Sequence, residues 1–266
     1  MKILIVGGGN MGLTYAKSLL NAHIVNQQNL MILEKSNEKA DIIKKLDVGT
    51  VFGEPDEYIK NADLIILAVK PQDSDILFGK IKGFIDHQQV VLSIMAGIPI
   101  DKISIALGSK KIIRAMPNLP AQVGSGMTVY TSSEDVTRIE LVMVQNILNS
   151  TGKTIYVDKE KLIDASTAIS GSGPAYVFYY IQSLIDAAQK LGFNQSESEL
   201  QAYSTFKGTI DLFNKHNFSC GEWISKVASR GGTTEAALNS YDNNDVKEKL
   251  SEAYFAAFTR ARELSE

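Results

Sequence analysis

Residues 2–12 read Lys-Ile-Leu-Ile-Val-Gly-Gly-Gly-Asn-Met-Gly: an apolar run of strand length, then the pattern Gly-x-Gly-x-x-Gly, with helical spacing from Met11 to Leu20. In a strand-turn-helix unit, the first glycine allows a tight turn, the second lets a pyrophosphate approach the backbone, and the third lets the helix pack close to the strand. The phosphates would rest on free N–H groups at the start of the helix. The stretch therefore predicts a dinucleotide-binding βαβ unit.

The first part of the chain repeats this alternation of strand and helix. Apolar runs of strand length lie at residues 2–6, 30–33, 64–69, 90–95, 111–114 and 127–130, and segments with helical spacing, such as 11–20 and 73–84, separate most of them. Continuous Val, Ile and Leu strands between helices are typical of a parallel sheet covered on both faces. The pattern predicts an α/β fold with an N-terminal Rossmann-like domain, a doubly wound and mostly parallel sheet, at residues 1–160.

Residues 161–266 are predicted to form an all-helical domain. Helical patterns cover residues 175–191, 196–213, 222–228, 233–240 and 246–264, and no proline follows Pro174. The segment 175–185 is apolar around almost its whole circumference, which is more than a surface helix of a monomer needs. It is expected either in a subunit interface or at the centre of a helical bundle.

Composition narrows the function classes. Of the 266 residues, 44% are hydrophobic, and 27 Lys and Arg against 30 Asp and Glu give a net charge of -3, so nucleic acid is a poor candidate partner. No apolar run approaches the ~20 residues that cross a bilayer, and the N-terminal run is too short for a signal peptide, so we expect no membrane partner. Cys220 is the only cysteine, which excludes an internal disulfide and fits a cytoplasmic location.

Charged and polar residues end the second predicted strand. Glu34 follows Gly12 by 22 residues, where a carboxylate would accept hydrogen bonds from the adenosine ribose and favour NAD. Lys35 and Ser36 come next and could hold the 2′-phosphate of NADP if the Glu34 side chain turns outward. The pattern leaves NAD and NADP both open, and these residues are also explained as solvated charges at a strand end.

Two further strands end at the same predicted sheet edge, where ligands of doubly wound folds lie. Ala68, Val69, Lys70 and Pro71 follow one of them, and Lys70 could donate a hydrogen bond to the nicotinamide ribose. Ile94, Met95 and Ala96 end the other and could form a floor under the nicotinamide. Both segments are also explained as ordinary turns between strand and helix.

Two glycine clusters lie in the helical part. They read Ser-Gly-Ser-Gly-Pro-Ala-Tyr at residues 170–176 and Ser-Arg-Gly-Gly-Thr-Thr at residues 229–234, and each precedes a helical segment. Consecutive N–H groups at Gly231 and Gly232 would suit a substrate carboxylate, and a threonine hydroxyl adds one more hydrogen bond. Each cluster also has a plain explanation as a turn between helices.

These motifs together resemble one enzyme family. The chain carries, in order, residues 7–12, 68–71, Arg-Ala-Met-Pro-Asn at 114–118, 170–176 and 229–234. This series resembles the 1-pyrroline-5-carboxylate reductases, and it runs across almost the full length. The two C-terminal strings are specific to that family, whereas many dehydrogenases share the N-terminal glycine turn.

The resemblance implies NAD(P)H-dependent reduction of a cyclic imino acid, 1-pyrroline-5-carboxylate, to L-proline in proline biosynthesis, with reduced NADP or NAD as hydride donor. It implies a C-terminal substrate-binding and dimerisation domain, a homodimer, and in some members a ring of dimers. The pattern and the resemblance give as cofactor-binding residues Val6, Gly7, Gly8, Gly9, Asn10, Met11, Gly12, Glu34, Lys35, Ser36, Ala68, Val69, Lys70, Pro71, Ile94, Met95 and Ala96. The substrate-binding residues would be Ser229, Gly231, Gly232, Thr233 and Thr234.

Thr234 is the candidate catalytic residue. None of the three histidines, His23, His87 and His216, lies in a motif, which is consistent with an imine that takes a proton from water and then accepts hydride. The protein would mainly orient two bound molecules, a contribution of about 7 to 11 kcal/mol to lowering the barrier. Thr234 is expected to orient or protonate the ring nitrogen.

Three residues depart from the family pattern: Leu119, Lys226 and Arg230. The two cations would flank the carboxylate site and could tighten anion binding or fit a related imine acid with a second negative group.

Two other functions stay open at this point. A β-hydroxyacid dehydrogenase would need Lys190 or Lys207 as its general base. A non-catalytic dinucleotide-binding protein would use the same glycine turn without turnover.

Overall fold

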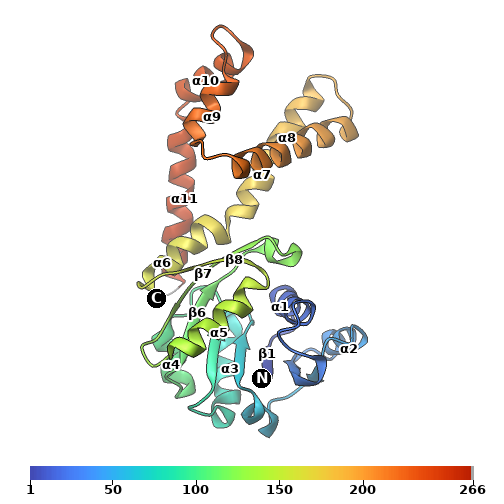
Figure 1. Ribbon diagram of the computed structural model, residues 1–266, viewed down its shortest axis with the longest axis vertical. Helices are drawn as coiled ribbons and strands as arrows, with labels where there is room; N and C mark the ends of the chain where they lie inside the picture. The colour runs from blue at the N-terminus through green and yellow to red at the C-terminus, as the bar shows by residue number, and fades with distance from the viewer. Residues whose placement is uncertain (265–266) are drawn as a thin grey trace. The chain divides into compact units, whose positions relative to one another are not determined.

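The computed structural model describes residues 1–264, which form an α/β domain and a set of helices (Figure 1). The strands are β1 (Ile3–Val6), β2 (Leu30–Leu33), β3 (Thr50–Phe52), β4 (Leu64–Leu67), β5 (Val90–Ser93), β6 (Ile112–Met116), β7 (Gly126–Ser132) and β8 (Gly152–Tyr156). The helices that alternate with them are α1 (Asn10–Asn21), α2 (Asn37–Lys45), α3 (Ser74–Ile81), α4 (Ile100–Leu107) and α5 (Arg138–Asn149). They are followed by α6 (Lys161–Ser166), the π-helical η6 (Thr167–Gly171), α7 (Gly173–Lys190), α8 (Gln195–Lys215), α9 (Cys220–Val227), α10 (Thr233–Asn243) and α11 (Val246–Glu263). Short 3-10 segments include η2 (Glu57–Asn61), η3 (Pro71–Asp73) and η5 (Leu119–Val123).

The strands form one sheet in the order β3-β2-β1-β4-β5-β6-β7-β8. The first six of these pair in parallel, β7 runs antiparallel to β6, and β8 is parallel to β7. The strand order reverses between β1 and β4, and ligands of such sheets bind at this reversal, outside the carboxyl ends of the strands. The predicted Rossmann-like, mostly parallel sheet is confirmed.

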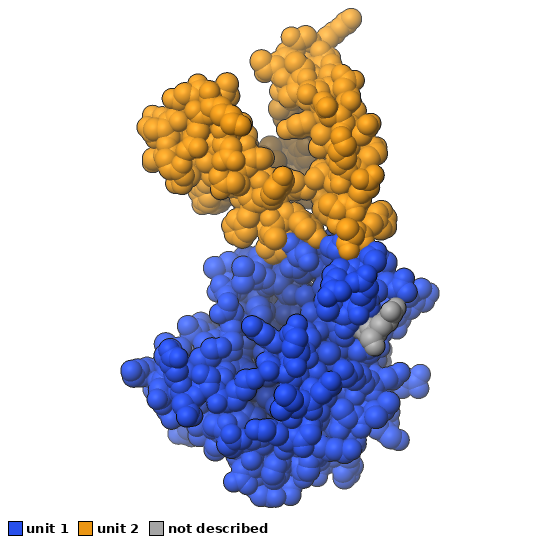
Figure 2. Space-filling view, turned by 180° about the vertical axis from the view of Figure 1, so that it is seen from behind, with its two compact units in different colours: residues 1–172, 257–266 blue, residues 173–256 orange. Residues whose placement is uncertain are grey.

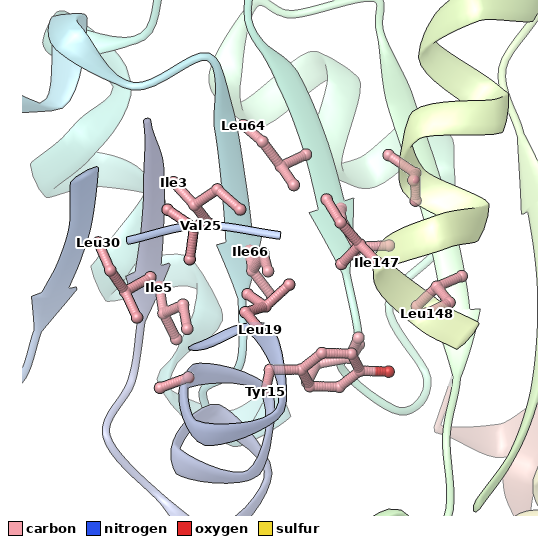
Figure 3. Close-up of a cluster of buried hydrophobic side chains, with 14 of the residues drawn as sticks. Ile3, Ile5, Tyr15, Leu19, Val25, Leu30, Leu64, Ile66, Ile147 and Leu148 are labelled. Carbon is pink, nitrogen blue, oxygen red and sulfur yellow. The ribbon is translucent and has the colours of Figure 1, made fainter. Parts of the chain in front are cut away.

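Side chains of β1 alternate between two hydrophobic clusters, one on each face of the sheet. Ile3 and Ile5 pack with residues of α1 and α5, as Figure 3 shows for Tyr15, Leu19, Ile147 and Leu148. Leu4 and Val6 pack instead with residues of α3 and α4. Because β1, β2, β4 and β5 are buried on both faces, they read as continuous apolar runs.

The described chain separates into two compact units, drawn in blue and orange in Figure 2. Unit 1 comprises Met1–Ser172 together with the residues from Ala257 on, and unit 2 comprises Gly173–Ala256. This division into compact units places residues 161–172 in unit 1, together with the sheet. The domain boundary near residue 160 stays a prediction.

Unit 2 has little core of its own. Within it, α7 and α8 pack on each other, and the hydroxyls of Tyr180 and Tyr254 lie 2.6 Å apart. Among the described residues, neither hydrophobic cluster includes a residue of unit 2. Helix α7 contains the largely apolar segment predicted at 175–185, yet only Ile185 of this helix is buried, while Phe178 and Tyr179 are exposed. Such large exposed apolar surfaces mark contacts with another chain, which favours the interface over the centre of a bundle.

Candidate active site

The turn from β1 into α1 has the geometry that its glycines predict. Gly7 has a φ of +107°, which only glycine adopts readily, and its N–H donates to the Leu33 carbonyl. A Cβ at Gly12 would lie 2.0 Å from the Gly7 oxygen, so this residue lets the helix approach the turn. A Cβ at Gly9 would meet nothing within 4 Å. Space is therefore left at the start of α1, where phosphate oxygens can reach backbone N–H groups.

A pocket of about 370 Å³ opens beside this turn, at the carboxyl ends of β1, β2 and β4. This is where the strand order reverses. Eight predicted cofactor residues line it: Val6, Gly7, Gly9, Glu34, Lys35, Ala68, Val69 and Lys70. Its other lining residues were not predicted: Leu33, Lys39, Gly53, Glu54, Pro55, Asp73, Ile76, Leu77 and Lys80. The apolar members among these, Leu33, Pro55, Ile76 and Leu77, suit one face of an adenine ring.

The remaining predicted cofactor residues lie outside this lining. Gly8 and Gly12 are buried within the turn, and Asn10 and Met11 begin α1. Ser36 caps α2 by accepting the Lys39 N–H, and Pro71 opens η3. Ile94 and Met95 are buried, and Ala96 is half-buried.

Glu34 forms part of the pocket floor and is only 7% exposed. Its carboxylate accepts a hydrogen bond from the Gly8 N–H on one oxygen and from the Ser36 N–H on the other, each at 2.9 Å. The side chain therefore turns inward and ties the glycine turn to the loop that follows β2. The Ser36 N–H is therefore already bonded to a carboxylate and is not free to donate to a 2′-phosphate.

Two ion pairs join the walls of the pocket. Lys35, after β2, lies 2.7 Å from Asp73 at the end of η3, and Lys80 of α3 lies 3.3 Å from Glu54. The hydrogen bond from Lys35 is the main cause that lowers the pKa of the Asp73 carboxyl, with further contributions from the charges of Lys35, Lys70 and Lys39. Neither Lys39 nor Lys70 forms an ion pair within the described residues.

Two family-like motifs of unit 1 contact each other. The Asn118 side chain donates to the Ser170 carbonyl at 3.0 Å and accepts the Met127 N–H at 2.9 Å. Arg114, 1% exposed, pairs with Glu160 at 2.9 Å and Asp164 at 2.7 Å. The Asn118 bond holds the π-helical segment η6, a geometry frequent at functional sites, and the Arg114 pairs hold the start of α6 next to it.

The substrate loop predicted at residues 229–234 lies in unit 2, between α9 and α10. Gly231 has a φ of +74°, and its N–H donates to the Glu235 carboxylate at 2.7 Å. The Gly232 N–H donates to the Ser229 carbonyl at 3.0 Å. Thr233 and Thr234 occupy the first two positions of α10, whose N-cap makes no side-chain hydrogen bond. Among the described residues, no backbone partner is recorded for the amides of Thr233, Thr234 and Glu235 at this helix start.

The three departures from the family pattern have different local surroundings. The Lys226 Nζ lies 4.4 Å from the centre of the Phe218 ring, so the ammonium group makes a cation-π contact with this ring. Arg230 is exposed in the loop, and Leu119 begins η5.

Of the two lysines that a β-hydroxyacid dehydrogenase would need, Lys207 pairs with Asp211 at 2.6 Å. This hydrogen bond raises the pKa of Lys207, the opposite of what a general base requires. Lys190 is an exposed residue at the end of α7. Neither residue supports that activity.

The described residues hold no group of three His, Cys, Asp or Glu side chains arranged to bind a metal. Over the same residues, no helix combines the length and apolarity that crossing a bilayer requires.

Comparison with known proteins gives matches over the full chain. Residues 160–264 match the family description "Pyrroline-5-carboxylate reductase dimerisation", and residues 2–97 match "NADP oxidoreductase coenzyme F420-dependent". A pyrroline-5-carboxylate reductase of Aquifex aeolicus is 34% identical over 99% of this chain and 97% of the relative. One of Staphylococcus epidermidis is 30% identical over 100% and 98%.

Solved structures agree. A Plasmodium falciparum pyrroline carboxylate reductase with NADP bound has a TM-score of 0.90 and 31% identity, with coverage of 100% of this chain and 98% of that one. The Coxiella burnetii pyrroline-5-carboxylate reductase gives a TM-score of 0.90 and 30% identity over the same shares. With these relatives spanning its whole length, and with a dimerisation region at its C-terminal end, this chain belongs to the pyrroline-5-carboxylate reductase family.

Proposed function

We propose that this chain reduces 1-pyrroline-5-carboxylate to L-proline with NADPH or NADH as the hydride donor. The observation that carries the proposal is the glycine turn of β1 and α1, which leaves open space at Gly9 beside a pocket at the reversal of the strand order. The family of the chain and the NADP in the Plasmodium relative support the same conclusion.

The pocket residues fit a dinucleotide. The start of α1 offers N–H groups to the pyrophosphate beside Gly9, and Lys70 stands ready to bind a ribose hydroxyl or a phosphate. Ile94, Met95 and Ala96 follow β5 at the same sheet edge and would lie nearer the nicotinamide end. When bound, the reduced nicotinamide supplies a hydride.

The loop of residues 229–234 would hold the imino acid. The amides of Thr233 and Thr234 would bind its carboxylate, and Gly231 would contribute once the Glu235 carboxylate leaves its N–H. The Thr234 hydroxyl would hold the ring nitrogen, which receives a proton from water. Addition of a hydride to the imine carbon would then convert the C=N bond into a C–N single bond.

The assembly and the location follow from the same reasoning. The chain self-associates through its dimerisation region, and the exposed apolar residues of α7 supply surface for that contact. A ring of dimers is proposed from the family resemblance, and a cytoplasmic location from the single, free Cys220.

The test is a turnover assay with purified protein, 1-pyrroline-5-carboxylate and either NADPH or NADH. We expect loss of the nicotinamide absorbance, with one proline formed for each dinucleotide oxidised. Tight dinucleotide binding without turnover would instead favour a non-catalytic binding protein, and turnover of a β-hydroxyacid would favour the dehydrogenase.

A further inference from the structure

The choice between NADPH and NADH depends on what meets the 2′ position of the adenosine ribose, at the end of β2. Four groups near this position could donate to a 2′-phosphate: the Ser36 N–H and the side chains of Lys35, Ser36 and Lys39. The Ser36 N–H already donates to the buried Glu34 carboxylate at 2.9 Å. Lys35, whose side chain is 74% exposed, directly follows Glu34 and is the charged donor nearest in sequence to this position.

Lys35 is itself engaged in this structure. Its Nζ lies 2.7 Å from Oδ1 of Asp73, a residue 38 positions further along the chain that also lines the pocket. Lys39 and Lys70 also line the pocket, and their charges help to lower the pKa of Asp73. The Asp73 carboxylate thus lies among three lysines, in an environment that would also attract a phosphate group.

The carboxylate of Asp73 is not needed to cap the helix that follows it. Asp73 is the N-cap residue of α3, but its side chain makes no capping hydrogen bond. The turn from η3 into α3 is held instead by the Ser74 hydroxyl, which donates to the Pro71 carbonyl at 2.7 Å. Asparagine is an equally good N-cap residue, so the charge of Asp73 can be removed without disturbing this helix start.

We propose that Asp73 sets the preference between NADPH and NADH by competing with the 2′-phosphate for Lys35. The inference rests on the proposed function. NADPH must release Lys35 from Asp73 to bind it, whereas NADH has no phosphate and leaves the pair in place. In this chain, Asp73 acts as a positioning residue, because its effect passes through Lys35.

The test measures direct binding of NADP⁺ and NAD⁺ by calorimetry at low salt, which needs no turnover. The variant Asp73→Asn should bind NADP⁺ about two- to fivefold more tightly, the range expected when an exposed ion pair no longer competes, and its affinity for NAD⁺ should stay unchanged. The gain should shrink at high salt, because exposed charges are screened.

Two matched variants make this result specific. Asp75→Asn removes the same charge two residues further along α3, where Asp75 pairs with Lys102 outside the pocket lining, and should leave both affinities unchanged. Lys35→Met should weaken NADP⁺ binding, and Asp73→Asn added to Lys35→Met should give no further gain.

Three results would overturn the inference: an unchanged NADP⁺ to NAD⁺ ratio in Asp73→Asn, an equal gain in Asp75→Asn, or a gain that persists without Lys35. Failure of the proposed function is measured separately, by absence of 1-pyrroline-5-carboxylate turnover in the unaltered protein, whereas failure of this inference is measured by the NADP⁺ to NAD⁺ affinity ratio of the variants.

Discussion

Replacement of Gly9 by alanine is expected to weaken dinucleotide binding while leaving the stability of the fold nearly unchanged. A Cβ at this position would meet no atom of the folded chain within 4 Å, and Gly9 already has a φ of -74°. Alanine reduces the entropy of the unfolded chain, a gain of about 0.4 to 1 kcal/mol. As an N-cap residue it is poorer than glycine by a similar amount, about 0.5 to 1 kcal/mol. The two effects offset each other, so we expect the free energy of unfolding to change by less than about 0.5 kcal/mol.

Dinucleotide binding should respond strongly to the same change. The added methyl group would occupy the space through which a pyrophosphate approaches the start of α1. Loss of one charge-assisted hydrogen bond costs about 1.5 to 3 kcal/mol, which corresponds to about 10- to 150-fold in the dissociation constant. Fluorescence titration with NADPH and NADH measures this loss, and thermal unfolding measures stability.

Gly12→Ala is the matched contrast. Its Cβ would lie 2.0 Å from the Gly7 oxygen, so the turn must shift, at about 1 to 3 kcal/mol of stability. Gly9→Ala should therefore lose binding at an unchanged melting temperature, whereas Gly12→Ala should lose both. Dinucleotide binding of Gly9→Ala at the affinity of the unaltered protein would refute the placement of the phosphates.

Four further substitutions test other parts of the account. Glu34→Ser removes the carboxylate from the pocket floor and should raise kcat/KM for NADPH relative to NADH, and an unchanged ratio would contradict its role. Thr234→Ala should lower turnover or raise KM for the imino acid, so unaltered values for both would exclude Thr234 from the site. Glu235→Gln removes a charged competitor for the Gly231 N–H and should lower that KM, whereas a higher KM would show that Glu235 assists binding. Burial raises the pKa of Tyr15 to about 12; this stabilisation is complete below the unfolded pKa near 10 and is lost as pH rises through 12, by about 1.4 kcal/mol per pH unit. Tyr15→Phe should therefore flatten the fall of unfolding free energy measured by urea denaturation between pH 10 and 12, and equal slopes would contradict it.

The sequence predicts the sheet best where its strands are buried on both faces. The predicted strand at residues 30–33 coincides with β2, and the apolar runs at 64–69 and 90–95 contain β4 and β5. The strands β3 and β8 escaped prediction. The first has three residues and the second reads Gly-Lys-Thr-Ile-Tyr with exposed positions, so neither presents a continuous apolar run.

The sequence predicts contacts of the site well when the residues are close together in the chain, and poorly when they are far apart. The roles of Gly7, Gly9 and Gly12 could be predicted because a strand, a turn and a helix lie within a few residues. The pair of Lys35 and Asp73 joins residues 38 positions apart, and no local pattern indicates which charges the fold brings together. The inward orientation of the Glu34 side chain could not be predicted from the sequence either, because it depends on a hydrogen bond from the Gly8 amide, 26 positions earlier in the chain.

The bond between Gly231 and Glu235 spans only four residues, yet the glycine pattern alone suggests an open amide. A glutamate four positions after a glycine at a helix start is the local signal that would have indicated a competitor for that N–H.

The central claim is that hydride passes directly to the imine carbon of the cyclic acid from the nicotinamide of a dinucleotide whose pyrophosphate is bound at the glycine turn. NADPH or NADH with deuterium at the transferring position of the ring tests this claim, with 1-pyrroline-5-carboxylate as substrate and mass spectrometry of the proline formed. The account predicts one deuterium per proline, at the carbon that had been doubly bonded to nitrogen. It also predicts that Gly9→Ala forms this labelled proline more slowly than the unaltered protein. Proline without deuterium, or no proline at all, would contradict it.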